Sequence, residues 1–286
     1  LMLDMAEYRG DVSRLRVVEP SVGGGAFVGP IVERLAASGA PWHELRDSLR
    51  GYDLRAEHVQ NCRAIARSIL DSAGCPIAEE LAEAWFQVGD FLLADVPEAD
   101  LVIGNPPYIR VENLDPALLA FYRHVCPTMT GRADIFVGFF EKGMDVLRPG
   151  GRLLYICADR WMRNGYGRDL RAKVVREFAV DDVLVMHDAD AFDDKVSAYP
   201  AIVNLRRGKQ SKVTVATAGE LFAESAASDY LRWRRGETSR WSSPDAEAAR
   251  MEHWHTTDAV WPDGSPDDLA WLSALDDLPA LERADV

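Results

Sequence analysis

The sequence lacks any long apolar run, since no stretch approaches the roughly 18 to 20 residues that a membrane-spanning helix needs. Residues 1–7 are amphipathic and carry no basic leader, so we expect no signal peptide. Together these two absences predict a cytoplasmic protein with no membrane partner.

Cysteine and histidine are scarce as well. The four cysteines, Cys62, Cys75, Cys126 and Cys157, form no CxxC pair and have no histidine at the spacing of metal ligands. We therefore expect reduced thiols and no bound metal. The six histidines are dispersed along the chain, and no Ser-His-Asp or Cys-His arrangement suggests a covalent nucleophile.

Two common nucleotide-binding motifs are also missing. The turn at Gly23-Gly24-Gly25, within residues 19–27, does not fit GxGxxG, and no Lys-Ser or Lys-Thr pair follows it as in a P-loop. This disfavours dinucleotides and nucleoside triphosphates. Glycines still let the backbone turn sharply and approach a ligand closely, although the same turn also serves ordinary tight packing.

Positive charge is in deficit, because the formal net charge is −14. Much of the excess acid lies in residues 241–286, where 11 acidic residues face 2 arginines. The acidic total argues against a nucleic-acid partner. Basic clusters at 160–173, 206–209 and 232–235 nevertheless leave room for a local basic face, although a solvated helix face is the favoured interpretation of any single cluster.

Strand-like and helix-like segments alternate over the first 208 residues. We expect strands at 15–19, 49–54, 86–88, 101–104, 152–157, 180–186 and 201–206. We expect helices at 30–38, 57–73, 136–147 and 166–178. The alternation predicts an α/β fold with a mostly parallel sheet and helices on both faces. After residue 209 we expect an irregular acidic segment, part of which packs because it holds five of the eight tryptophans.

The most informative motif is Asn105-Pro106-Pro107-Tyr108, which follows the apolar strand expected at 101–104. In open α/β sheets the carboxyl ends of the strands are where ligands bind. The Asn105 side-chain oxygen and the Pro106 carbonyl are acceptors beside the flat face of Tyr108, which suits a planar substrate with an NH2 group. Two acceptors on the amino hydrogens localise the nitrogen lone pair and make the amine nucleophilic. The alternative is a rigid loop without chemistry.

Two acidic residues follow other expected strands. Asp53 ends the strand at 49–54 and could accept hydrogen bonds from both ribose hydroxyls of a nucleoside-like cofactor, or could cap a helix. Asp90 and Phe91 follow the strand at 86–88. They could contact an adenine amino group and ring, or form an Asx turn with a core phenylalanine.

Taken in this order, these residues resemble the S-adenosylmethionine-dependent amino-methyltransferases. The resemblance is greatest to the gamma class of adenine-N6 DNA methyltransferases of bacterial restriction–modification and phage-defence systems. It extends from about residue 14 to residue 208, and three stretches carry it beyond the general fold: 105–112, 133–167 and 195–203.

The resemblance implies a Rossmann-like, seven-stranded methyltransferase fold over residues 1–208, with 209–286 as a linker or the start of a target-recognition region. It implies S-adenosylmethionine as the cofactor and a flipped-out adenine in double-stranded DNA as the substrate. The implied cofactor-binding residues are Glu19, Pro20, Gly23, Gly25, Phe27, Asp53, Asp90 and Phe91. The implied catalytic residues are Asn105, Pro106, Pro107 and Tyr108, with Tyr108 and Phe192 stacking on the target base.

The sequence departs from that family at both ends. The family's cofactor-binding element before the first strand is cut or absent here, and residues 209–286 are short for a recognition domain. We therefore expect a fragment, or a subunit that takes DNA recognition from a partner subunit or works with a fused nuclease. Two other functions stay open: methylation of a protein glutamine or an RNA base, and an incomplete cofactor-binding or interaction module.

Overall fold

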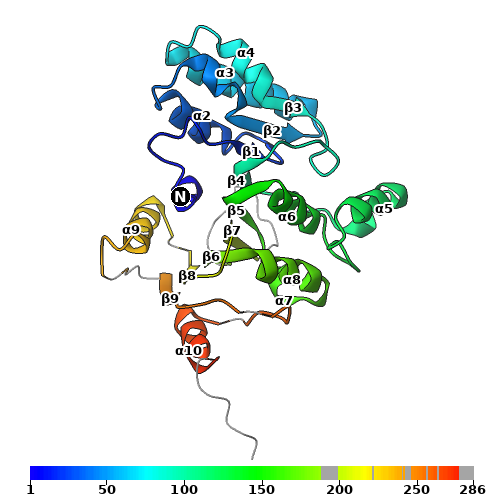
Figure 1. Cartoon of the computed structure of the whole chain (residues 1–286), viewed down its shortest axis with the longest axis vertical. Helices are drawn as coiled ribbons and strands as arrows, with labels where there is room; N and C mark the ends of the chain where they lie inside the picture. The colour runs from blue at the N-terminus through cyan, green and yellow to red at the C-terminus, as the bar shows by residue number, and fades with distance from the viewer. Residues whose placement is uncertain are drawn as a thin grey trace, which may run out of the picture.

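The computed structural model describes residues 1–187, 199–220, 222–239, 241, 246–255, 257–262 and 264–276. The strands of these residues form one nine-stranded sheet in the order β3-β2-β1-β4-β5-β7-β6-β8-β9. Figure 1 shows the sheet running through the molecule with helices on both sides. From β1 the sheet grows toward β3 on one side and toward β4 on the other, so the strand order reverses between β1 and β4. Such a switch point is where α/β sheets bind ligands.

The strands agree closely with the predicted ones in the first 208 residues. Their bounds are β1 Val17–Glu19, β2 Leu49–Asp53, β3 Phe86–Val88, β4 Ala99–Gly104, β5 Leu147–Ala158, β6 Phe178–Val185 and β7 Pro200–Arg207. The first five strands pair in parallel, and β7 lies antiparallel between β5 and β6. The predicted mostly parallel α/β sheet is confirmed.

The helices cover both faces of the sheet. Their bounds are α1 Met2–Met5, α2 Val28–Ala36, α3 Ala56–Ser72, α4 Ala78–Trp85, α5 Pro116–Val125, α6 Phe136–Asp145, α7 Arg160–Arg163, α8 Arg168–Glu177, α9 Glu224–Arg234 and α10 Pro266–Asp276. One buried cluster joins one face of the sheet to α1, α2, α3, α4 and α9. The other joins the opposite face to α6 and α8. Among the described helices, none has the length and apolar character to cross a membrane.

Strand β5 begins at residue 147, earlier than the predicted 152, because its first residues already pair with β4 before a β-bulge shifts the register. Leu147 pairs with Ala99, and the ladder shifts register before Arg152 pairs with Leu101. Pro149 has no N–H to donate, and Gly150 has a φ of 81°, which disfavours most other residues. Pro149 and Gly150, which follow the helix expected at 136–147, therefore lie in a bulge inside a strand.

The C-terminal segment is less irregular than expected. Strand β8 (Val213–Ala218) pairs in parallel with β6, and β9 (Ala246–Met251) pairs antiparallel with β8. Trp233, Trp254 and Trp261 are buried, as the tryptophan content predicted. The division of the chain at residue 208 stays a prediction, although strands from both sides of it share one sheet.

Candidate active site

The sheet brings the predicted site residues to one edge. Glu19 is the last residue of β1 and Asp53 the last of β2, and Asn105 directly follows β4. Strand β1 pairs in parallel with both β2 and β4, so the carboxyl ends of all three strands lie side by side. Asp90 follows β3, the next strand along the same edge.

The glycine turn lies between β1 and α2 and is fastened to β2. Gly23 and Gly25 have φ values of 49° and 88°, a region that favours glycine. A Cβ at Gly25 would lie 2.8 Å from the Cδ1 of Ile65, so no larger residue fits there without a shift. A Cβ at Gly23 would meet no atom within 4 Å, which leaves the turn open on that side.

Asp53 is the residue that holds this turn. The backbone N–H of Gly23 donates to Asp53 Oδ2 at 3.0 Å, and that of Arg55 donates to Oδ1 at 2.9 Å. His58 Nδ1 lies 3.1 Å from the same Oδ2. The bond from Arg55 is an Asx-type turn just before α3 and not the helix cap that the sequence left open, because the N-cap of α3 is Arg55 and has no side-chain cap. A carboxylate has about four lone-pair positions, so the role toward a ribose is still possible and stays a prediction.

Glu19 is buried at the centre of the site. Its side chain is 1% exposed, and its Oε2 accepts no hydrogen bond from the described residues. Burial raises the pKa of Glu19 well above its usual value, and the nearby Asp53 carboxylate raises it further. An unpaired buried acceptor costs about 1–3 kcal/mol, so a donor or a cation at this position would stabilise the protein.

Asp90 and Phe91 form a turn that packs into the core. Asp90 accepts from the N–H of Leu92 at 3.0 Å and from the hydroxyl of Tyr122 at 2.6 Å. Phe91 is buried, and its ring stacks on Phe139 with 5.4 Å between the centroids. These contacts match the alternatives considered from the sequence, an Asx turn for Asp90 and a core position for Phe91. The predicted contacts with an adenine remain predictions.

The Asn105-Pro106-Pro107-Tyr108 motif leaves β4 next to the start of the glycine turn. A Cβ at Gly104 would lie 3.3 Å from Pro20, so the residue after Glu19 packs against the end of β4. Asn105 is half-buried, and its Oδ1 is a buried acceptor with no hydrogen bond from the described residues. Pro106 is buried, while Pro107 is half-buried.

Tyr108 joins the motif to β5. Its ring is half-buried and tilted against Phe136, with 6.5 Å between the centroids. Its hydroxyl has a hydrogen bond with the backbone of Ala158, the last residue of β5. Burial raises the pKa of Tyr108 above its usual value, so the phenol stays neutral. The stacking role of Tyr108 stays a prediction.

Phe27 and Phe192 are the remaining predicted site residues, and their roles stay predictions. Phe27 occupies the N-cap position of α2 without a side-chain cap bond, and it is half-buried against the core on that face of the sheet. Phe192 lies in residues 188–198, outside the part of the chain that the structure describes. Within the described part, no group of three or more histidine, cysteine, aspartate or glutamate side chains is arranged to hold a metal ion.

Comparison with known proteins connects this geometry to a family. The family model described as Eco57I restriction-modification methylase matches residues 68–192, which include the Asn-Pro-Pro-Tyr motif. The type II methyltransferase M.PaeR7I of Pseudomonas aeruginosa is 39% identical over 218 residues, which cover 72% of this chain and 38% of that protein. The chain is a relative of the restriction–modification DNA methyltransferases. The resemblance found in the sequence motifs is thereby confirmed.

The similarity to these methyltransferases extends over the whole chain. The type II methyltransferase M.XhoI of Xanthomonas vasicola is 32% identical over 299 residues, which cover 99% of this chain and 54% of that protein. The chain thus spans about half or less of the length of these curated relatives. A solved Listeria monocytogenes protein assigned to the class I S-adenosylmethionine-dependent methyltransferases shares the fold, with a TM-score of 0.54 at 16% identity, over 77% of this chain and 63% of that one.

This chain also has a polar hollow near its Asn-Pro-Pro-Tyr motif, which was not predicted from the sequence. It has a volume of about 390 Å³ and lies at the carboxyl end of β5, lined by Asp159, Arg160, Arg163, Asn164, His187 and Tyr199. The guanidinium of Arg160 lies 5.7 Å from the ring centroid of Tyr199, whose side chain is 54% exposed. The sequence signal was the basic cluster at 160–173, which we interpreted as a solvated helix face.

Asp159 organises the floor of this hollow. It is buried, and its Oδ2 lies 2.9 Å from His187 Nε2 and 3.0 Å from Arg163 Nε. Burial alone would raise the pKa of Asp159, but the bonds with His187 and Arg163 hold it below its usual value. The carboxylate is therefore ionised, and it fixes the side chains of Arg163 and His187 near the end of β5.

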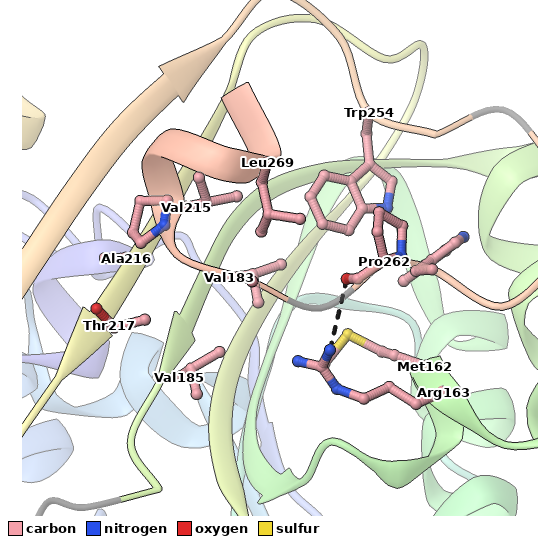
Figure 2. A pocket seen from close by; sticks show the side chains of 13 residues that line it. Met162, Arg163, Val183, Val185, Val215, Ala216, Thr217, Trp254, Pro262 and Leu269 are labelled. Carbon is pink, nitrogen blue, oxygen red and sulfur yellow. Dashed lines mark hydrogen bonds between the residues drawn. The ribbon is translucent and has the colours of Figure 1, made fainter. Parts of the chain in front are cut away.

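A second cavity, about 20 Å³ in volume, lies where the C-terminal segment packs on the sheet. Figure 2 shows Val183, Val185 and Val215 facing Trp254 and Leu269 across it, with Arg163 donating to the Pro262 carbonyl at 3.5 Å. A space of that size holds about one water molecule, and its walls are mainly apolar. We interpret it as an imperfection of core packing, separate from the candidate site.

Proposed function

We propose that this chain carries the catalytic core of an enzyme that transfers a methyl group from S-adenosylmethionine to the N6 amino group of an adenine flipped out of DNA. The proposal rests mainly on one observation. Glu19 Oε2 and Asn105 Oδ1, at the ends of two paired strands, are buried acceptors without a hydrogen bond from the described residues. An unpaired acceptor at a strand end is a place for a ligand donor.

The residues on the β1–β3 side fit the cofactor. Glu19 Oε2, a buried acceptor without a hydrogen bond from the described residues, would accept from the ammonium of the methionine group, and the open turn at Gly23 lets the backbone approach a ligand. Asp53 has acceptor capacity for ribose hydroxyls. When bound, S-adenosylmethionine supplies a methyl group that its sulfonium has already activated.

The residues after β4 fit an aromatic amine. Asn105 Oδ1 and the Pro106 carbonyl would accept from the two amino hydrogens, and Tyr108 would support the flat ring. Because Oδ1 is buried in this conformation, a turn about the last torsion of Asn105 must bring it toward the amine, and such torsions are soft. Most of the acceleration would come from positioning, since the methyl group needs no further activation.

The hollow at the end of β5 favours DNA as the source of the amine. It offers guanidinium groups and an exposed aromatic ring beside the motif, although the chain as a whole is acidic. A paired, stacked adenine cannot reach a methyl donor, so the base has to leave the duplex first. The proposal includes a cytoplasmic enzyme, a further recognition region or partner subunit, and restriction–modification as the biological setting.

The central experiment is the substitution Asn105→Ala. Purified protein, radiolabelled S-adenosylmethionine and genomic DNA are incubated together, and digested nucleosides are separated to find N6-methyladenine. We expect the substitution to abolish labelling, whereas Asn113→Ala, a change at an exposed asparagine just after the motif, preserves it. Near-normal N6 labelling by the Asn105 variant would contradict the proposed role.

The same reaction decides between amine substrates. Label that appears in tryptic peptides or in ribonucleosides, and not in DNA, would assign the chemistry to a protein amide or an RNA base. If calorimetry detects no binding of S-adenosylmethionine at millimolar concentration, the chain does not work as a methyltransferase core on its own.

A further inference from the structure

One face of helix α3 lies along the glycine turn. The face consists of His58, Asn61, Cys62 and Ile65, whose spacing places them on one side of a helix. Asn61 Nδ2 donates to the Gly24 carbonyl at 3.1 Å, and the Cys62 thiol lies 3.8 Å from the Gly23 carbonyl. Each residue of the turn thus contacts this helix face.

His58 connects this face to Asp53. Its Nδ1 lies 3.1 Å from Asp53 Oδ2, the same oxygen that accepts from the Gly23 backbone at 3.0 Å. Asp53 therefore has three partners that fix both of its oxygens: the turn, the following backbone and the imidazole. A carboxylate left to itself turns broadly about its last torsion, so these contacts decide where its remaining lone pairs point.

His58 and Asn61 lie outside the buried face that stabilises helix α3. Helix α3 is anchored by its buried side chains Val59, Cys62, Ala66 and Leu70. Asn61 is exposed and the His58 side chain is 29% exposed, so neither adds much to the core. The Asn61 contact is exposed and contributes little to folding, and Asp53 keeps its two backbone donors when His58 is replaced. The contacts of both residues can still lower the cost of binding, because groups that are already oriented need no ordering when a ligand arrives.

We propose that His58 and Asn61 are positioning residues of the cofactor site. His58 holds the Asp53 carboxylate in the orientation that receives a ribose diol, and Asn61 holds the glycine turn in the shape that admits the rest of the nucleoside. The proposal rests on the proposed function, since it concerns the same cofactor. It assigns to α3 a part in binding that the strand-end residues alone do not perform.

The test is calorimetric titration of the chain with S-adenosylhomocysteine. His58→Leu keeps bulk but removes the ring nitrogens, and His58→Asn restores an N–H near the position of Nδ1. We expect His58→Leu and Asn61→Leu each to weaken binding about fivefold to tenfold, as for a lost hydrogen bond to a polar group, and His58→Asn to recover most of the loss. The control Gln60→Leu alters an exposed residue on the same helical turn and should leave affinity unchanged.

Thermal unfolding without ligand completes the experiment. A positioning role predicts that both leucine variants unfold within about 2 °C of the wild type, since surface changes are small in free energy. Wild-type affinity in both leucine variants would overturn the proposal. So would an affinity loss matched by a large fall in the unfolding temperature that His58→Asn does not repair. Failure of the wild type itself to bind would instead refute the proposed function, and this inference with it.

Discussion

Glu19 and Asn105 come from neighbouring parallel strands, and each buries a side-chain oxygen that accepts no hydrogen bond from the described residues. Two such groups at one sheet edge destabilise the unliganded protein. The arrangement is what a binding site requires, because a ligand with the right donors recovers the missing interactions. Under the proposed function, Glu19 would thereby link the stability of the fold to binding of the ligand.

This link predicts a pH dependence. Because the folded-state pKa of Glu19 is raised, its contribution to stability is complete below the usual pKa of 4.5 and is lost as pH rises through the folded-state value. Glu19→Gln removes the titration. We expect this variant to unfold at a higher temperature than the wild type near pH 7 without ligand, with the difference shrinking toward pH 4. Glu83→Gln, at an exposed helix position, serves as the control, and equal pH profiles for Glu19→Gln and wild type would refute the assignment.

Two substitutions of Tyr108 distinguish the contribution of its ring to methyl transfer from that of its hydroxyl. Tyr108→Phe removes only the bond to the Ala158 backbone, so most methyl transfer should remain. Tyr108→Ala removes the ring, and stacking on a base is worth about 1–3 kcal/mol, which corresponds to roughly a 5-fold to 150-fold loss in kcat/KM. Steady-state transfer to DNA measures both variants. Equal activity in Tyr108→Ala and wild type would exclude stacking.

The hollow at the end of β5 predicts a contact with the DNA backbone. We expect Arg160→Gln to weaken DNA binding and to lower the slope of log affinity against log salt by about 0.9, the value for one phosphate contact. Fluorescence anisotropy with a labelled duplex at several salt concentrations gives this slope. Arg176→Gln is a matched control, because Arg176 is exposed near the start of β6, at the opposite edge of the sheet. An unchanged slope for Arg160→Gln would place the phosphates elsewhere.

Removing the ion pair between Asp182 and Arg234 should lower the stability of the fold without a direct effect on the candidate site. Asp182 is fully buried in β6 and accepts from Arg234 Nε at 2.5 Å and Nη2 at 2.8 Å. Arg234→Met leaves a buried carboxylate without its cation, so we expect a loss of about 3–5 kcal/mol in urea unfolding. Adding Asp182→Asn should recover much of it. Arg232→Met, on the exposed side of the same helix, should cost little.

Local pattern carried enough information for much of the site. Asn105 and the glycine turn follow short apolar strands, and the carboxyl ends of parallel strands have to meet at one edge, so their proximity was predictable. The pairing of Asp159 with His187 was not, because the two residues end different strands and only the antiparallel insertion of β7 sets their distance.

Helices α4 and α5 were not predicted, although the sequence contains a recognisable signal for each. Helix α4 places its buried residues Ala78, Leu81, Ala82 and Trp85 at helical spacing, and Asp115 followed by Pro116 marks the start of α5. Strand β8 is short and rich in alanine and threonine, so its membership in the sheet depends on the edge that β6 offers. Local propensity could not supply that information.

The pairing of β8 with β6 has a practical consequence for dissecting this protein. Cutting the chain at residue 208 would remove β8, one of the two neighbours of β6, and expose a row of backbone amides and carbonyls without partners. Exposed strands of that kind recruit other copies and aggregate. A soluble minimal version therefore has to retain β8 and β9, even if the chemistry resides entirely upstream.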